Sequence, residues 1–506
     1  MPRPLRNRLP GIVVTIEPDV GIIGPAGFER FPCIVGYGDI EIPKERALAI
    51  TRNATASGSW KTATQDALTE SVATVYQSGR SPGLTHYRQP TDFVVVDGED
   101  ADGNPISLID WADGSTVPDA DAVYYVSYTV QMPSTAFEPT LYLDEDLLVR
   151  ERGAEVIFSD ENEINPLVTA SRLAFAQGAP GVIVTQLDFL GFNSPSDEDA
   201  AWENPLDPNG ADMATAYSIA IGKVDKIEEF KLFLVPLDPS TNPSDSTKNF
   251  PGGADQNARW HDHAILASDP EEGRERTLLA AIPIGTTLDG LRNIAQAYKD
   301  TGGGQRFVVP GVKGRNSDEA SSVSISIESV NGAVVPTTFL NAIMAGLLTG
   351  SPIGAPNNNA PVSNVALFDD WTIPEARVLR GDGVVPYKTR SGRVRMVIPI
   401  TSDTTNAFTE DLSLQDIADY LRAFIRVKLF DQFRNVNITG DTEGAIVAAL
   451  SSLLNGLVLD QILVGFTGIQ ANQRTDEPRK IDVRGKAKPA FPLRWIDVDL
   501  EFTATI

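Results

Sequence analysis

The residues of this sequence that could do chemistry are few, and the histidines come first. The 506 residues include three histidines, two of which, His261 and His263, flank Asp262. Imidazoles at this spacing bind zinc only if the fold supplies further ligands. A serine-histidine-aspartate relay would have to use His86, His261 or His263, and no GxSxG elbow is expected. We interpret the histidine pair as structural, and a hydrolase on an α/β core that uses His261 or His263 is the alternative.

Two other segments carry residue types found in cofactor or catalytic sites. The segment TGGGQRFVVPG at residues 301–311 precedes a predicted strand, whereas glycine-rich phosphate loops lie between a strand and a helix. Cys33, the only cysteine, lies in the apolar run FPCIVGYG, where cysteine is typically a small buried hydrophobe. A single cysteine also excludes an internal disulfide and a thiolate metal cluster. The sequence therefore predicts no catalytic residue, no metal site and no cofactor.

The charge of the chain limits its partners. With 42 Lys and Arg against 68 Asp and Glu, the net charge of −26 argues against binding nucleic acid or acidic lipid. The basic residues gather near the C-terminus, where residues 377–435 hold ten Lys and Arg against seven Asp and Glu. A locally basic face suits an acidic protein partner. No long apolar run or apolar leader indicates a membrane span or secretion, so folding in a cytoplasm is expected.

Short predicted strands lie near both ends of the chain. Apolar residues alternate strictly with Asp, Glu and Thr over residues 496–506, which is the period of a strand with one buried face. Residues 12–16 form a β-branched run. The apolar residues of the two segments are Ile12, Val13, Val14, Ile16, Ile496, Val498, Leu500 and Phe502. Such strands are ordered only when docked in a sheet, either within their own subunit or in the sheet of another copy.

The elements between these strands predict three kinds of region. Short strands separated by Asp, Gly, Asn and Pro predict a small β-rich domain at residues 84–132, after a helix-compatible segment at residues 57–81. From residue 165, helices alternate with strands, including a short strand at residues 264–267, which predicts an α/β fold with a mostly parallel sheet. The fold class is therefore α+β and α/β in several domains.

The C-terminal region predicts an α+β domain. Residues 384–399 form a hairpin, and a capping box of Ser413 and Asp416 opens a long helix. A second helix covers residues 442–455, with Gly456 as its stop, and strands follow at residues 461–466 and 480–483. Basic side chains project from the first helix, namely Arg422, Arg426 and Arg434.

In this order, the elements resemble contractile phage tail sheath proteins, particularly the Mu-like branch. The resemblance rests on the PGIVV and FPCIVGYG strands, the inserted β module, the central α/β region, and the helices LSLQDIADYLRAFIRVKLFDQF and AALSSLLNGLV. It spans nearly the whole chain and is sharpest over residues 384–506. Pro399 departs from it, because related chains often keep an arginine before the pair Ile400 and Thr401.

The resemblance implies a structural subunit and no enzyme. Such subunits polymerise around a tail tube by adding terminal strands to neighbouring sheets, and contract to drive the tube through the host envelope. The implied domains are an N-terminal arm (1–30), a central α/β domain (31–83 and 133–360), an inserted β domain (84–132), a C-terminal assembly domain (361–492) and a C-terminal arm (493–506).

The resemblance also implies the partners and the location of the chain. The partners would be other copies in a helical stack of rings, the tail tube protein, and the baseplate and tail terminator proteins, with no nucleic acid and no membrane insertion. We expect Arg422, Arg426 and Arg434 to face the tube. The subunit would be assembled in the host cytoplasm and become part of the virion tail. Another structural protein of a virion or surface layer is the second alternative.

Overall fold

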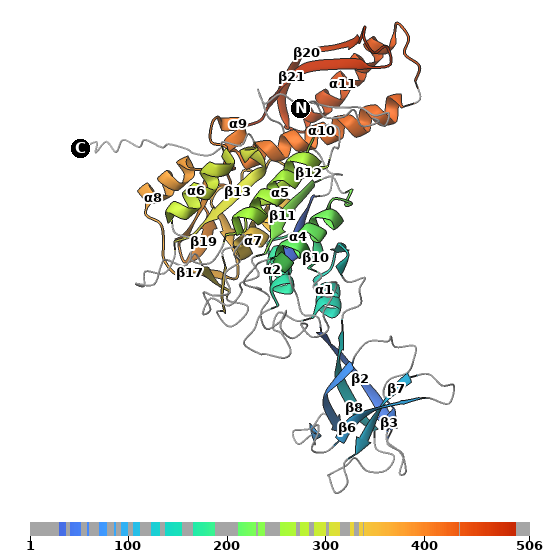
Figure 1. Cartoon of the computed structure of the whole chain (residues 1–506). Coiled ribbons are helices and arrows are strands. Elements are labelled where there is room, and N and C mark those ends of the chain that lie inside the picture. The colour runs from blue at the N-terminus through green and yellow to red at the C-terminus, as the bar shows by residue number, and fades with distance from the viewer. Residues whose placement is uncertain are drawn as a thin grey trace, which may run out of the picture. The chain divides into compact units, whose positions relative to one another are not determined.

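The computed structural model covers the chain shown in Figure 1. The residues that the structure describes are 30–36, 41–51, 58–59, 70–77, 86–87, 93–99, 105–111, 123–131, 137–153, 165–187, 211–228, 231–237, 253–269, 274–282, 288–299, 303–313, 324–327, 333–336, 338–434 and 436–491. Both predicted terminal strands, at residues 12–16 and 496–506, lie outside them. The chain divides into two compact units, one of Met1–Tyr37, Pro139–Leu143 and Thr169–Ile506 and the other of Gly38–Glu138 and Asp144–Val168.

The first unit is built on a large, mostly parallel sheet. Its strands are, in spatial order, β16 (Ala360–Val362), β19 (Arg393–Met396), β18 (Val384–Arg390), β13 (Phe307–Gly311), β12 (Glu275–Leu279), β11 (Lys231–Pro236), β1 (Arg30–Gly36), β10 (Val182–Gln186) and β9 (Thr140–Tyr142). The strands from β18 to β10 run parallel, and the outer strands are antiparallel. The inner strands β1, β10, β11, β12 and β13 are buried along their length, which explains their mostly apolar sequences, although β1, β11 and β12 each begin with a charged residue.

Helices cover this sheet (Figure 1). They are α2 (Pro166–Ala176), α4 (Ala211–Val224), α5 (Gly253–Ala267), α6 (Leu288–Lys299), α7 (Thr338–Gly350) and α8 (Ile373–Gly381). Helix α7 is buried on nearly every side, as its uniformly apolar sequence predicts, and it packs on β1, β11 and β13. The short strands β14 (Ser324–Ile327), β15 (Ala333–Pro336) and β17 (Val365–Leu367) form a separate small sheet.

One expectation for this region is wrong. Residues 264–267 end helix α5 instead of forming a strand, because Trp260, Ala264 and Ala267 recur at helical spacing and are all buried. The domain boundary expected between residues 360 and 361 stays a prediction, and strand β16 of the large sheet begins at residue 360. The hairpin of β18 and β19 extends the sheet beside β13, so hydrogen bonding joins it to the central strands. The predicted alternation of helices and strands from residue 165 is otherwise confirmed.

The second unit contains two small antiparallel sheets and a helix. The elements are β2 (Glu41–Thr51), β3 (Gly58–Ser59), β4 (Glu70–Gln77), β5 (His86–Tyr87), β6 (Phe93–Glu99), β7 (Pro105–Trp111), β8 (Val123–Gln131) and α1 (Glu145–Arg152). Strands β6, β7 and β8 were predicted. The helical interpretation of residues 57–81 is wrong, because the β-branched and aromatic residues of β4 pair with β8. Strands β2 and β3 also pair here, so this unit begins well before residue 84.

The C-terminal elements of the first unit follow the predicted order. They are α9 (Ala407–Glu410), α10 (Leu412–Phe433), α11 (Thr442–Leu459), β20 (Leu463–Gln473) and β21 (Ile481–Pro489). The capping box of Ser413 and Asp416 is not formed, since Asp411 caps α10 by accepting from Ser413 N–H at 2.9 Å. Helix α11 continues past Gly456, because the next residue, Leu457, is buried in the core.

Two glycines of α7 allow it to lie against the chain at α2. A Cβ added to Gly346 would lie 2.3 Å from the carbonyl oxygen of Ala174, and one added to Gly350 would lie 2.3 Å from that of Gly178. Both obstacles are backbone atoms, which cannot move aside as a flexible side chain does. The close approach of α7 to α2 and to the turn after it therefore depends on these positions.

We expect Gly346→Ala to lower the free energy of unfolding by about 2 kcal/mol or more, because the new methyl group overpacks the helix contact. Chemical denaturation measures this change. The control is Gly222→Ala in α4, where no atom lies within 4 Å of the new Cβ. That variant should be unchanged or up to about 1 kcal/mol more stable, because alanine favours a helix. Equal effects of the two substitutions would contradict the close contact.

Candidate functional site

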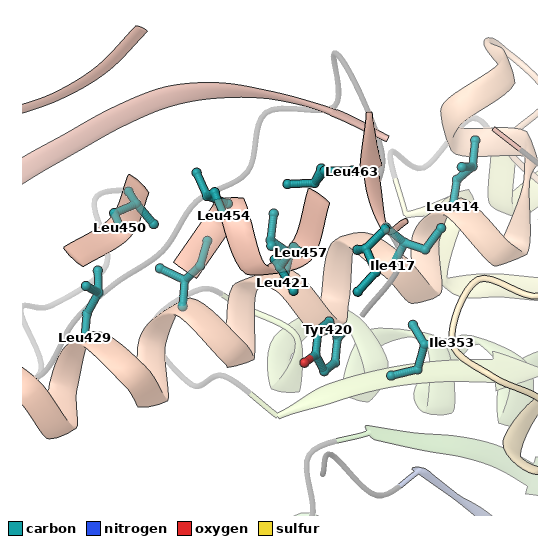
Figure 2. Close-up of a cluster of buried hydrophobic side chains, with 12 residues drawn as sticks. Ile353, Leu414, Ile417, Tyr420, Leu421, Leu429, Leu450, Leu454, Leu457 and Leu463 are labelled. Atoms are coloured by element: carbon teal, nitrogen blue, oxygen red, sulfur yellow. The ribbon is translucent and has the colours of Figure 1, made fainter. Parts of the chain in front are cut away.

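Helix α10 has an apolar face that holds the C-terminal elements together. The spacing of its leucines and isoleucine places them on one side of the helix. Figure 2 shows that this side meets the facing side of α11. The buried cluster includes Leu414, Ile417, Leu421 and Leu429 of α10, Leu450, Leu454 and Leu457 of α11, and Leu463 of β20. These three elements therefore share one core, and α10 lies between that core and the large sheet (Figure 1).

The strands β20 and β21 form a two-stranded sheet with open edges. Within the described residues they pair only with each other. One face packs on the core of α10 and α11 through Phe466, Ile469, Val483 and Ala487. A lone two-stranded sheet is marginal in water, so this packing supports it. The outer edge of each strand has backbone groups without a strand partner among the described residues, and such edges accept strands from other chains.

Helix α11 presents an uncharged outer face. Its exposed residues include Gly444, Ala445, Ala448 and Ser452, and it has no charged residue after Glu443. By length and composition alone α11 could cross a membrane, and it is the one helix among the described residues that passes this test. Its opposite face is buried against α10 and β20, which is the arrangement of a helix that packs within a folded domain.

The other face of α10 is ionic and meets the beginnings of the parallel strands. Strands β1, β11 and β12 begin with Arg30, Lys231 and Glu275, and Arg306 immediately precedes β13. Because the strands are parallel, their first residues lie at the same end of the sheet, where the strands begin. Helix α10 brings its carboxylates, Asp416 and Asp419, and its guanidinium group, Arg422, to this end of the sheet. We call these seven residues the ionic joint.

The ion pairs of the joint are close and buried. Lys231 Nζ lies 2.6 Å from Asp419 Oδ2 and 3.1 Å from Asp416 Oδ1. Arg306 Nη2 donates to Asp419 Oδ1 and to Glu275 Oε2, both at 2.7 Å. Arg30 donates to Asp416 and to the carbonyl of Ser351. The side chains of Lys231, Glu275 and Asp419 are 0% exposed, so the joint excludes water.

Burial and neighbouring charges shift the titration of these groups in opposite directions. Burial raises the pKa of Glu275, and the nearby Asp419 carboxylate raises it further. Burial alone would also raise the pKa of Asp419, but Arg306, Lys231 and Arg422 hold it below its ordinary value of 3.8. Against the effect of burial, Asp419 and Glu275 raise the pKa of Arg306. Asp419 therefore stays ionised and is the centre of the joint.

The three arginines predicted to face the tube have different surroundings. Arg422 is 12% exposed at its side chain and belongs to the joint, where its Nη2 lies 2.7 Å from Asp419 Oδ1. Arg426 is half-buried one turn further on, and burial lowers its pKa. Arg434 is exposed at the end of α10. The structure thus places Arg422 beside other charged residues of this chain. Contact of the three arginines with a tube stays a prediction.

The two candidate histidines of the alternative enzyme lie in the core. His261 is 2% exposed, and its Nε2 lies 2.8 Å from the carbonyl oxygen of Gly303. His263 is 7% exposed, and its Nδ1 lies 3.7 Å from Asp225. Burial lowers the pKa of both rings, that of His263 to about 4. Neither ring is hydrogen-bonded to a serine hydroxyl among the described residues.

One segment has the letters of a hydrolase motif. Residues 79–83, GRSPG, match GxSxG, so the expectation that the sequence lacks this motif is wrong, and they lie outside the described residues. The hydrolase elbow joins a strand to a helix, whereas this segment lies between strands β4 and β5. In the part of the chain that the structure describes, no group of three or more His, Cys, Asp and Glu residues is placed to hold a metal ion.

The sequence interpretation missed most of the ionic joint. Arg422 and Asp416 were singled out for other reasons, and Asp419 and the four residues at the strand starts were not singled out. A signal was present, because three buried strands, RFPCIVG, KLFLVP and ERTLL, each begin with a charged residue. Buried charges are rare without partners. Charged first residues in three neighbouring strands therefore indicate a shared partner at the end of the sheet where these strands begin.

Comparison with known proteins gives matches in structure only. No family model and no curated protein matches this sequence. A structure of the anti-feeding prophage baseplate is 15% identical, with a TM-score of 0.49, over 74% of this chain and 90% of that chain. The sheath tail protein of Desulfitobacterium hafniense is 10% identical, with a TM-score of 0.40, over 95% and 100%. The sheath complex of the extracellular contractile injection system PVC, in its contracted state, is 12% identical, with a TM-score of 0.43, over 73% and 87%.

We expect Asp419→Asn to lower the free energy of unfolding by about 3 to 5 kcal/mol, because it leaves buried cations without their central partner. The contribution of Asp419 is present above its ordinary pKa of 3.8 and is lost as the pH falls below that value, because its pKa is lowered in the folded state. The difference in the free energy of unfolding between the wild type and the variant should therefore decrease as the pH is lowered. Denaturant unfolding at several pH values measures this difference.

The matched control is Asp431→Asn, which removes an exposed carboxylate from the same helix. It should change the free energy of unfolding by less than about 0.5 kcal/mol. Similar losses for the two variants would show that the joint contributes no more than a surface charge.

Proposed function

We propose that this chain is a structural subunit of a contractile tail sheath, which polymerises around a tail tube by strand addition between subunits. The observation that carries the proposal is the two-stranded sheet of β20 and β21, whose edges are open among the described residues. The same sequence carries two predicted strands, at residues 12–16 and 496–506, that suit such edges. Acceptor edges and donor strands in one chain are the requirements of a polymer built from identical subunits.

Backbone pairing between subunits suits a structure that must move without falling apart. Each added strand forms several main-chain hydrogen bonds, with a net contribution of about 0.5 to 1.5 kcal/mol for each bond. A flexible segment between the donor strand and its own subunit would let subunits rotate and slide while the strands stay paired. Contraction is then a change between two packings of the same subunits, and its energy is the difference between them.

The ionic joint gives the acceptor sheet a fixed place on its own subunit. Helix α10 contacts the core of β20 and β21 with one face and the starts of the parallel strands with the other. Force applied through an added strand would therefore reach the large sheet through α10. Buried ion pairs are favourable only in a narrow range of geometries, so α10 and the large sheet would move together.

The partners follow from this role. We infer a homo-oligomer in a helical stack of rings around a tail tube protein, with baseplate and terminator proteins at its ends and the virion tail as its location. Of the three basic candidates, Arg434 is the most exposed and is the first choice for a tube contact. Arg426 is half-buried, and Arg422 would have to leave Asp419 and Glu275 to reach a partner. No catalytic residue and no cofactor belong to the proposal.

Deletion of residues 497–506 should give a folded subunit that does not polymerise. The donor strand is lost, whereas the described core and the ionic joint are untouched. Negative-stain microscopy and sedimentation measure polymer formation, and the thermal unfolding midpoint checks the fold. Normal cylinders from the truncated chain, with an unchanged unfolding midpoint, would refute strand addition by this segment.

A further inference from the structure

The hairpin of β18 and β19 carries four cations on one face. A two-residue turn at residues 391–392 joins its strands, and both φ angles there are positive (54° and 73°), as a tight hairpin turn of this length requires. In the register of the hairpin, Lys388 is directly opposite Arg395, and Arg390 is directly opposite Arg393. Opposite residues share a face, and so do alternate residues of one strand. We call these four residues the cationic face.

The other face of the hairpin is mostly apolar and buried. Tyr387 and Met396 are 0% exposed, and Val394 is 4% exposed. Packing of these side chains fixes the hairpin with its cationic face turned away from the core. The two arginines at the tip, Arg390 and Arg393, are exposed.

The cationic face forms no ion pair with the residues that the structure describes. Lys388 Nζ donates to the carbonyl oxygen of Trp371 at 2.6 Å, and Arg395 Nη1 donates to that of Asn359 at 2.7 Å. These partners are neutral backbone groups. The two arginines at the tip have no hydrogen bond or ion pair to the described part of the chain.

The arrangement of like charges is unfavourable for the hairpin alone. Cations directly opposite each other repel, and this hairpin has two such pairs in succession. A carboxylate is present beside the hairpin, that of Asp370, but it accepts from the backbone N–H of Thr389 at 2.6 Å. A partner that brings several negative charges to the cationic face would remove the repulsion.

The second unit is the acidic part of this chain. Its residues, Gly38–Glu138 and Asp144–Val168, include 23 Asp and Glu against 8 Lys and Arg. A quarter of the chain therefore carries −15 of the net charge of −26. Among its described acidic residues, Asp144, Asp146 and Glu151 of the α1 region are exposed. Every further copy of the chain thus supplies an acidic surface of the kind that the cationic face requires.

The topology of the large sheet favours a contact between copies. Strands β18 and β1 are parallel to each other and are separated by β13, β12 and β11. The hairpin turn follows the carboxyl end of β18, and the chain leaves the carboxyl end of β1 at Gly36 to enter the second unit. Both features therefore lie at the end of the sheet opposite the ionic joint, about 19 Å apart across four strand spacings.

These two features also lie toward opposite edges of the sheet. Strands β16, β19 and β18 are at one edge, and β1, β10 and β9 are at the other. Copies set edge to edge in the same orientation would bring the hairpin of one beside the connection to the second unit of the next. Contact between two different surfaces of identical subunits is heterologous, and heterologous contacts generate rings or helical arrays.

We propose that the cationic face of the β18–β19 hairpin binds the acidic second unit of another copy of this chain. This inference rests on the proposed function and adds to it a lateral contact between subunits. Each copy gives its hairpin to one neighbour and its second unit to another. Opposite charges favour this orientation of neighbours over its reverse, and salt weakens the contact.

Charge reversal at the tip of the hairpin tests the inference. The R390E/R393E chain should need a roughly tenfold or greater increase in protein concentration to polymerise, because attraction to the acidic unit becomes repulsion. The R390K/R393K chain keeps both charges and should polymerise like the wild type. Sedimentation and negative-stain microscopy measure polymer formation, and the thermal unfolding midpoint checks that both variants are folded.

A single reversal elsewhere is the control for a change of net charge. Lys226 is exposed just after α4, away from the hairpin in the sheet order. R390E should raise the concentration needed for polymerisation severalfold, whereas K226E should leave it unchanged. Polymerisation of the folded R390E/R393E chain at wild-type concentrations would overturn the inference.

A cross-link identifies the surface that the hairpin contacts. The R390K/R393K chain presents amines at the tip, and a carbodiimide joins amines to carboxylates in contact with them. In polymers of mixed unlabelled and isotope-labelled chains, mass spectrometry should find the tip joined to residues 38–138 or 144–168 of a differently labelled copy. Links within one copy alone, or links of the tip to other parts of the chain or to another protein, would overturn the inference.

The same experiment separates this inference from the proposed function. Cylinders that form without the cross-link to the second unit would refute the contact and keep the sheath function. The cross-link between copies in assemblies that are not cylinders would keep the contact and refute the sheath function.

Discussion

The arrangement of the first unit depends on one buried carboxylate, Asp419. A fully buried charge is costly unless it is paired, and Asp419 is paired with Lys231, Arg306 and Arg422 together. Two of these partners lie at the starts of parallel strands and the third on α10 itself. The helix therefore occupies the position in which its carboxylates meet the end of the sheet where these strands begin. The elements that pack on the far face of α10 are placed by the same constraint.

The two faces of α10 make contacts of different kinds. Apolar packing against α11 and β20 is non-directional and tolerates small shifts, whereas the ionic joint requires specific distances and hydrogen bonds. Removing one partner of the ionic joint leaves an uncompensated charge in a buried environment. The ion pairs of the joint therefore depend on one another. The two contacts together hold the sheet of β20 and β21 in one orientation on the central sheet.

Sequence patterns predicted the buried strands and the long helices, because apolar runs and helical periodicity are local signals. They failed where distant contacts decide. Residues 70–77 form a strand because β8 pairs with them, and Asp416 binds Arg30, 386 positions away in the sequence, while Asp411 caps α10. The charged first residues of β1, β11 and β12 were a visible signal, but their common partner on α10 is known only from the fold. No local pattern contains that pairing.

Exposed cations on an edge strand have a protective role, since lysines at sheet edges prevent identical edges from pairing with each other. On β21 the exposed cations are Arg484, Lys486 and Lys488, and their direct neighbours on β20 are uncharged. These charges would repel a second β21 and any other basic strand. The row of charge therefore opposes the association of two copies through identical edges.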